Sequence, residues 1–73
     1  MISANEIKRY GFTRQEVRVC HLVADSKPSA DIAAALVVEI PAVYKLERRI
    51  RSKVSASNRA DAIQRLKELG FGQ

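Results

Sequence analysis

Residues 45–54 concentrate positive charge on a segment whose spacing predicts a helix. The ten positions of KLERRIRSKV carry five cationic side chains: Lys45, Arg48, Arg49, Arg51 and Lys53. Between them, Leu46, Ile50 and Val54 recur every four residues, which is typical of a helix with one buried face. Ammonium and guanidinium groups bind phosphate oxygens and the acceptor edge of guanine. The segment is therefore either the solvated face of an ordinary helix or a helix that lies against an anionic partner.

The charge of the whole chain is distributed unevenly. Residues 1–40 carry five basic and five acidic side chains, so their net charge is 5 − 5 = 0. Residues 41–73 carry eight basic and three acidic side chains, so their net charge is 8 − 3 = +5, which is the net charge of the whole protein. A basic half of this kind is typical of a surface that meets phosphates or anionic lipid.

Other chemistry finds little support in the composition. The chain lacks a Cys/His cluster, a Ser/His/Asp set, paired carboxylates and a glycine loop for phosphate, so we predict no enzyme, no metal, no cofactor and no small-molecule substrate. His21, the only histidine, is interpreted as an ordinary surface or boundary residue of a helix. Cys20, the only cysteine, lies on an apolar stripe and is interpreted as a buried structural thiol.

The same composition bears on where the protein works. No apolar run approaches the roughly 18 residues that a membrane span requires, and the first residues lack the apolar stretch of a secretory signal. A lone cysteine fits a reducing compartment. We therefore expect a cytoplasmic protein without a membrane partner.

Local signals place four helices, with expected ranges of 14–24, 29–36, 41–54 and 58–69. Thr13 and Glu16 have the spacing of a capping box, Pro41 suits the first turn of a helix, and Gly70 suits the residue that ends one. The second and third helices are separated by a short turn, and the third carries cations on its free side. This arrangement is that of a helix-turn-helix, whose recognition helix enters the major groove of DNA. We predict an all-α, four-helix domain without a sheet over residues 12–73, after a short leader over residues 1–11.

The spacing over residues 12–63 resembles the LuxR/GerE-type helix-turn-helix family of bacterial transcription regulators. The family opening "L-T-x-R-E/x-E" is similar to FTRQE at 12–16, and its "E-I-A-x-x-L" core is similar to DIAAAL at 31–36. Its recognition helix, "T-V-K-x-H-x-x-x-I-x-x-K-L", is similar to AVYKLERRIRSKV at 42–54, and its "S-x-R-x-x-A" is similar to SNRADA at 57–62. The chain departs from the pattern at Ala42, Tyr44 and Leu46, which replace Thr, Lys and His.

The resemblance implies roles for particular residues. The positions that match the base-contacting residues of the family are Tyr44, Lys45 and Arg48. The expected phosphate contacts are Ala42, Arg49, Arg51, Lys53 and Arg59. The fourth helix, which commonly pairs subunits in the family, presents a candidate dimer strip of small or polar residues: Ala60, Ile63, Gln64 and Lys67. We expect a monomer or weak homodimer that pairs on DNA.

Several of these roles have ordinary alternatives. Arg49 can instead pair with Glu47 or Glu39 on the surface. Arg59 can cap or brace the fourth helix rather than contact phosphate. Tyr44 can stack on a sugar or a thymine methyl group, or simply cover its helix.

The sequence therefore predicts a bacterial transcription regulator that works in the nucleoid. It would bind double-stranded DNA sequence-specifically, with the helix over about 41–54 in the major groove. The alternative, suggested by the three departures from the family pattern, is a small helix-turn-helix-fold protein that binds another regulator rather than DNA. RNA polymerase is a further possible partner, because the promoter-binding region of a sigma factor has a similar layout.

Overall fold

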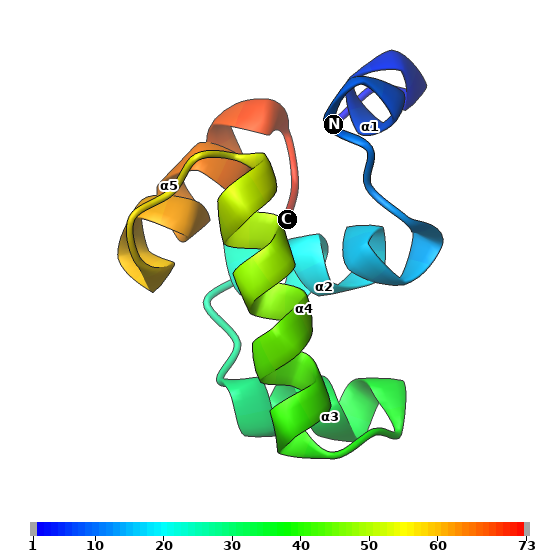
Figure 1. The fold of residues 1–73 in the computed structure, drawn as a ribbon, viewed down its shortest axis with the longest axis vertical. Helices are drawn as coiled ribbons and strands as arrows, with labels where there is room; N and C mark the ends of the chain where they lie inside the picture. Colours follow the sequence, from blue (N-terminus) through cyan, green and yellow to red (C-terminus); the bar gives the residue numbers. More distant parts are fainter. Residues whose placement is uncertain (1, 73) are drawn as a thin grey trace.

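A computed structural model describes residues 2–72, which form five α-helices and no strand (Figure 1). They are α1 (Ala4–Tyr10), α2 (Arg14–Ala24), α3 (Ser29–Leu36), α4 (Ile40–Lys53) and α5 (Arg59–Leu69). The all-α prediction is confirmed. The prediction of four helices is wrong, because the segment expected to be a leader contains a helix of its own.

That additional helix, α1, has complete end signals. Ser3 is the N-cap, and its side chain accepts a hydrogen bond from the backbone N–H of Glu6. Gly11 ends the helix with φ of 72°, a left-handed angle that glycine adopts without a steric penalty. Ile2 and Phe12, which flank α1, are buried in the same hydrophobic cluster as the rest of the core.

The bounds of the other helices follow from their caps. In α2, the hydroxyl of Thr13 accepts from the N–H of Glu16 while the carboxylate of Glu16 accepts from the N–H of Thr13, which confirms the predicted capping box. Asn58 caps α5, and Gly70 ends it with φ of 103°. Helix α4 begins at Ile40, one residue before the predicted start, and Pro41 lies in its first turn.

The core is centred on α2, which packs against α3, α4 and α5 (Figure 1). Val19 and Cys20 of α2 are fully buried, as are Ile32 of α3, Ile50 of α4 and Leu66 of α5. Each of the helices α2 to α5 therefore contributes its apolar stripe to one core, which fixes the side of α4 that faces inward.

Aromatic contacts join the two ends of the described chain. The ring of Phe12 lies 5.7 Å from the ring of Tyr10 and 5.6 Å from that of Phe71, the latter edge to face. The ring of Phe71 also meets the imidazole of His21, at 5.0 Å. These contacts hold α1 and the residues after α5 against α2.

Within residues 2–72, no helix combines the length and apolar character that a membrane crossing requires.

Candidate nucleic-acid interface

The outer face of α4 is polar and cationic. Leu46 and Ile50 are buried on the inner side, as the four-residue spacing predicts, and Val43 is buried with them. The side chains that remain exposed on the opposite side are Tyr44, Lys45, Arg48, Arg49 and Ser52. Arg51 is half-buried at the edge of this set. We call the surface formed by Tyr44, Lys45, Arg48, Arg49 and Arg51 the basic face.

The cations of the basic face form no ion pair within residues 2–72, although the charge of Arg49 acts on Glu16 from a longer distance. The ion pairs formed there join Arg9 to Glu6, Lys53 to Glu16, Arg59 to Glu47 and Arg65 to Asp61. None of them includes Lys45, Arg48, Arg49 or Arg51. The suggested surface pairing of Arg49 with Glu47 or Glu39 is therefore not formed. Four cations within residues 45–51 leave this face electropositive and available to an anionic ligand.

Glu47, on the other side of α4, is buried, and its carboxylate already has polar partners. Its exposed fraction is 5%, so it lies inside and not on the surface, where the suggested pairing with Arg49 would have placed it. Its Oε2 accepts a hydrogen bond of 2.9 Å from the hydroxyl of Ser29, the first residue of α3, and lies 3.7 Å from Nη2 of Arg59. The same guanidinium donates to the backbone carbonyl of Lys27. We call these groups the Glu47 cluster; it connects α3, α4, α5 and the turn before α3.

The Glu47 cluster favours the bracing role suggested for Arg59. Its guanidinium braces the start of α5 against α4 and against the turn at Lys27. Its Nε is buried without a hydrogen-bond partner, which leaves one donor of the brace unused. The predicted phosphate contact would have to break these interactions, so we do not include Arg59 in the basic face.

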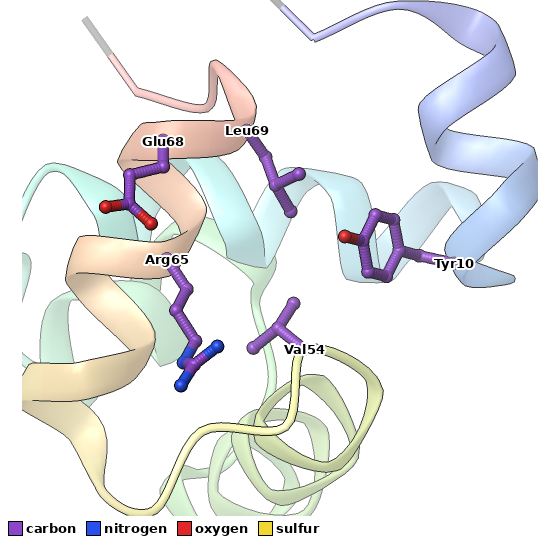
Figure 2. Close-up of a pocket in the computed structure, with 5 residues that line it drawn as sticks. All are labelled: Tyr10, Val54, Arg65, Glu68 and Leu69. Carbon is purple, nitrogen blue, oxygen red and sulfur yellow. The ribbon is translucent and has the colours of Figure 1, made fainter.

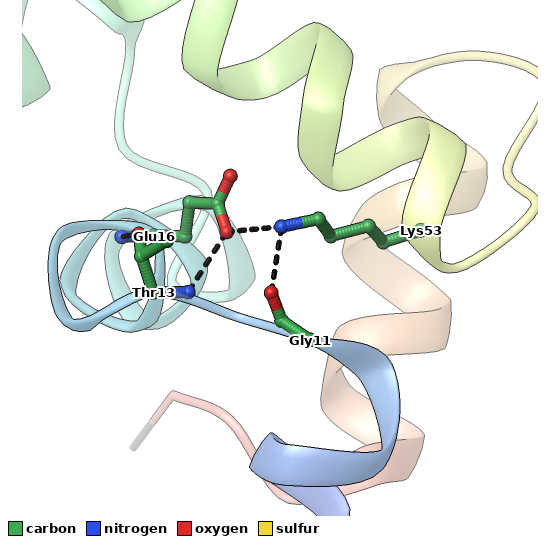
Figure 3. Close-up of polar contacts among 4 residues, drawn as sticks. All are labelled: Gly11, Thr13, Glu16 and Lys53. Carbon is green, nitrogen blue, oxygen red and sulfur yellow. Dashed lines mark hydrogen bonds and ion pairs between the residues drawn. The ribbon is translucent and has the colours of Figure 1, made fainter.

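A second buried carboxylate, Glu16, binds the last residue of α4 (Figure 3). Nζ of Lys53 is ion-paired with Oε1 of Glu16 and donates a hydrogen bond of 2.8 Å to the carbonyl of Gly11. The ammonium group also lies 5.9 Å from the centre of the Phe12 ring. We call Gly11, Thr13, Glu16 and Lys53 the Glu16 cluster. Lys53, predicted to contact phosphate, instead joins α4 to α2 and to the end of α1.

The electrostatics of Glu16 reflect these partners. Burial favours the neutral acid and would raise its pKa, because only 1% of the residue is exposed. The hydrogen bonds from Lys53 and Thr13, together with the charges of Lys53 and Arg49, outweigh burial and hold the pKa of Glu16 below its ordinary value of 4.5. The carboxylate is therefore ionised at neutral pH, and the Glu16 cluster is a charged one.

Ala42 also does not fit its expected role. Its side chain has no hydrogen-bond donor, and its backbone N–H donates to the carbonyl of Glu39 at 3.0 Å.

The candidate dimer strip on α5 is largely at the surface: Ala60, Gln64 and Lys67 are exposed, whereas Ile63 is half-buried against the core.

The structure also reveals exposed apolar residues, of which the sequence had singled out only Tyr44. The large hydrophobic side chains exposed among residues 2–72 are Val37 at 89%, Tyr44 at 55% and Ile40 at 38%. Val37 lies in the three-residue connection between α3 and α4, and Ile40 is the first residue of α4. Periodicity gave no signal for Val37, because its exposure depends on the turn in which it lies.

His21 and Cys20 have structural positions. Nδ1 of His21 accepts a hydrogen bond of 3.0 Å from the backbone N–H of Gly72, so the ring anchors the residues after α5. Cys20 is fully buried, and burial, assisted by the charge of Glu16, raises the pKa of its thiol to about 12. No group of three or more potential metal ligands occurs in the described part of the chain.

A pocket of about 130 Å³ lies at the other end of α4 (Figure 2). Its lining side chains come from α1, the residue after α4, and α5: Tyr10, Val54, Arg65, Glu68 and Leu69. Nε of Arg65 lies 3.2 Å from both carboxylate oxygens of Asp61, so this cation is already paired. Within residues 2–72, the charge left unpaired in the pocket is thus the anionic Glu68, which does not attract phosphate, and the pocket lies apart from the basic face.

Comparison of the chain with known protein families, with curated proteins and with solved structures found no significant match.

Proposed function

We propose that this protein binds double-stranded DNA sequence-specifically as the DNA-binding domain of a bacterial transcription regulator, with α4 in the major groove. The observation that carries the proposal is the basic face, where four cations within residues 45–51 are unpaired and lie on the free side of one helix. The resemblance of the sequence to LuxR/GerE-type domains supports it. The packing of α3 against α4 through a three-residue connection is compatible with the helix-turn-helix that this resemblance implies.

The dimensions of α4 suit this role. Fourteen residues give a helix about 21 Å long, and a helix fits the major groove, which is about 12 Å wide. In the proposed complex, Lys45 and Arg48 point at base edges and can donate to O6 and N7 of guanine, Arg48 with two hydrogen bonds. Arg49 and Arg51, toward the edges of the face, would contact the phosphates that bound the groove.

The pairing of two copies belongs to the same proposal. Exposed Ala60, Gln64 and Lys67 on α5 give a small and mainly polar contact, which is too weak to hold a dimer in dilute solution. Two adjacent half-sites on one duplex would hold two copies close together and let this contact form. We therefore propose a protein that is monomeric when free and pairs on DNA in the nucleoid, without catalytic activity.

The competing function is docking onto another regulator or onto RNA polymerase. The exposed apolar residues Val37, Ile40 and Tyr44 favour it, because contiguous apolar surface often marks a protein interface. We favour DNA because four unpaired cations border those residues, and a cluster of like charge on one helix is the electrostatic pattern of a phosphate-binding surface.

The test is selection of duplexes from a random pool, followed by fluorescence anisotropy with the selected and a scrambled duplex between about 50 and 200 mM salt. We expect tight binding to the selected duplex, with an affinity that falls steeply as salt rises. Arg48→Ala should reduce the preference for the selected duplex by about 10-fold or more, since one two-pronged guanine contact provides about 1–3 kcal/mol of discrimination.

Two further variants separate base contacts from general charge. Arg51→Ala should weaken binding to both duplexes equally and lower the slope of log affinity against log salt by about 0.9. Lys8→Ala is the matched control, because Lys8 is an exposed cation of α1, which lies at the other end of the molecule from the α3–α4 connection (Figure 1). Lys8→Ala should change neither the affinity for the two duplexes nor the salt slope. Failure to bind any duplex at 50 mM salt would overturn the proposal and leave a protein partner as the better hypothesis.

A further inference from the structure

The exposed apolar residues are close together in the chain rather than scattered along it. Val37, Ile40 and Tyr44 fall within eight consecutive positions, at the connection between α3 and α4 and along the first turns of α4. Ile40 and Tyr44 are four residues apart and so lie on the same side of the helix. We call these three residues the apolar strip. Single exposed hydrophobic residues are ordinary, but a contiguous set indicates a binding surface.

The apolar strip continues directly into the basic face. Arg48 lies four residues beyond Tyr44, so Ile40, Tyr44 and Arg48 form one row along α4. Lys45 lies in the adjacent row, next to Tyr44. Whatever covers the strip therefore brings negative charge within reach of Lys45 and Arg48, because neither cation is paired within residues 2–72.

The backbone at Val37 adds an independent observation. Its φ is 57° and its ψ is 50°, in the left-handed region that β-branched residues rarely adopt. Its N–H completes the end of α3 by donating to the carbonyls of Ala33 and Ala34. Glycine or asparagine would fill this position with less strain. The backbone of Val37 is strained and its side chain is 89% exposed, so this valine does not stabilise the fold. Its presence points to a ligand outside the fold.

Duplex DNA offers this combination of apolar and anionic groups in the major groove. The C5 methyl of thymine is the apolar group exposed there, and it lies between the phosphate-lined walls and beside the hydrogen-bonding edges of the bases. We propose that the apolar strip packs against thymine methyl groups, so that the binding site carries thymine next to the guanine contacted by Arg48. This inference rests on the proposed DNA binding and specifies the sequence class that is bound.

The spacing of the row sets the distance between the two bases. Four residues of helix advance about 6 Å, and successive base pairs are about 3.4 Å apart. Tyr44 and Arg48 are thus separated by about two base-pair steps, and Ile40 extends the apolar contact by about two more. A selected site should therefore show thymine about two base pairs from an essential guanine.

The experiment replaces thymine by deoxyuridine, one position at a time, in the selected duplex. Uracil keeps the hydrogen-bonding edge of thymine and removes only the methyl group. At the thymines near the guanine, we expect affinity to fall about fourfold per methyl, from the transfer free energy of one buried methyl group. Thymines elsewhere in the duplex should tolerate the change.

The variant Val37→Gly tests whether the strip is responsible. Glycine accepts the left-handed angle, so the variant should fold at least as well as the natural chain. Its affinity for the thymine duplex should fall, and its sensitivity to deoxyuridine at the position nearest Val37 should disappear. Ser26→Gly is the matched control, because Ser26 is exposed and has φ of 63° in the turn after α2. It makes the same kind of backbone change outside the strip and should keep the full deoxyuridine effect.

The outcomes separate this inference from the proposed function. Tight, salt-dependent binding that ignores every deoxyuridine substitution would overturn the methyl contact and leave DNA binding intact. An equal loss of affinity for the thymine and deoxyuridine duplexes in Val37→Gly would also overturn the methyl contact. Val37 would then affect binding only through the backbone conformation. Absence of binding to any duplex would overturn the proposed function itself.

Discussion

Two groups of cations on and around α4 have opposite environments. Lys53 and Arg59 are each bound to a buried carboxylate, Glu16 and Glu47, and both also donate to a backbone carbonyl. The cations of the basic face form no ion pair within residues 2–72. Residue type does not distinguish the groups, because each contains lysine and arginine. What distinguishes them is whether the fold brings a carboxylate from another helix to the same place.

This difference has a physical consequence for what each group contributes. Removing one partner of a buried ion pair leaves the other charge desolvated, which costs folding free energy. Removing an exposed, unpaired cation changes stability by about 0.5 kcal/mol or less. The paired cations should therefore affect stability and the unpaired ones binding, and the two effects should be separable by mutation.

The largest effect is expected at Lys53. Lys53→Met keeps most of the side-chain length and leaves Glu16 buried without its cation, so the free energy of unfolding should fall by about 2–3 kcal/mol. Urea denaturation followed by circular dichroism measures it. Lys45→Met makes the same change on the basic face and should alter stability by about 0.5 kcal/mol or less. Equal losses in the two variants would contradict the division into paired and unpaired cations.

A slightly smaller effect is expected at Glu47. Glu47→Ala removes the acceptor for Ser29 and the anionic partner of Arg59, so stability should fall by about 2 kcal/mol. Its control is Glu39→Ala, because Glu39 is exposed and its side chain makes no cap hydrogen bond to α4. If Glu39→Ala cost as much as Glu47→Ala, the Glu47 cluster would not be what holds α3 and α5 to α4.

The pH dependence of stability sharpens the comparison further. Because the pKa of Glu16 is lower in the folded protein than its ordinary value of 4.5, its contribution is fully present above pH 4.5 and is lost as pH falls through the folded value. Thermal melts should therefore show steady stability from pH 7 to 5 and a decline below about pH 4.5. Glu16→Gln should flatten that decline. Asp61 is more exposed than Glu16 and its pKa is also lowered, first by the backbone N–H of Ser57, so Asp61→Asn should flatten the decline less. An identical decline in Glu16→Gln would show that other carboxylates control it.

The sequence predicted most of the helices because their ends have local signals. Thr13 with Glu16, Asn58, and Gly70 mark ends that need no knowledge of the rest of the fold. Helix α1 was missed because seven residues with no buried member give little amphipathic pattern. What holds it in place is the bond from Lys53 to Gly11 and the contact of Phe12 with Phe71, both of which link distant parts of the chain.

For the candidate site, too, the sequence predicted what depends on local spacing and missed what depends on distant residues. The four-residue spacing correctly placed Tyr44, Lys45 and Arg48 on the outer side of α4. It could not show that Lys53 is bound inside, because its partner Glu16 lies 37 positions earlier in the chain. Nor could it show Val37 at the surface, since that depends on the left-handed turn after α3.

The smallest expected effect on stability is a gain, and it concerns Val37. A non-glycine residue in the left-handed region costs about 1–2 kcal/mol, and the added freedom of glycine in the unfolded chain takes back about 0.4–1 kcal/mol. Val37→Gly should therefore stabilise the protein by about 0.5–1 kcal/mol, which raises the melting temperature by a few degrees. Ser26→Gly should give less, because serine lacks the branched Cβ that makes this angle costly for valine.

Differential scanning calorimetry of the three proteins decides this point. A loss of stability in Val37→Gly would mean that the valine side chain packs against the fold despite its 89% exposure, and the case for an external ligand at that residue would fail. A gain in stability together with weaker DNA binding would show the opposite. The natural chain would then keep a residue that destabilises the fold because the residue serves the surface that α4 presents to its partner.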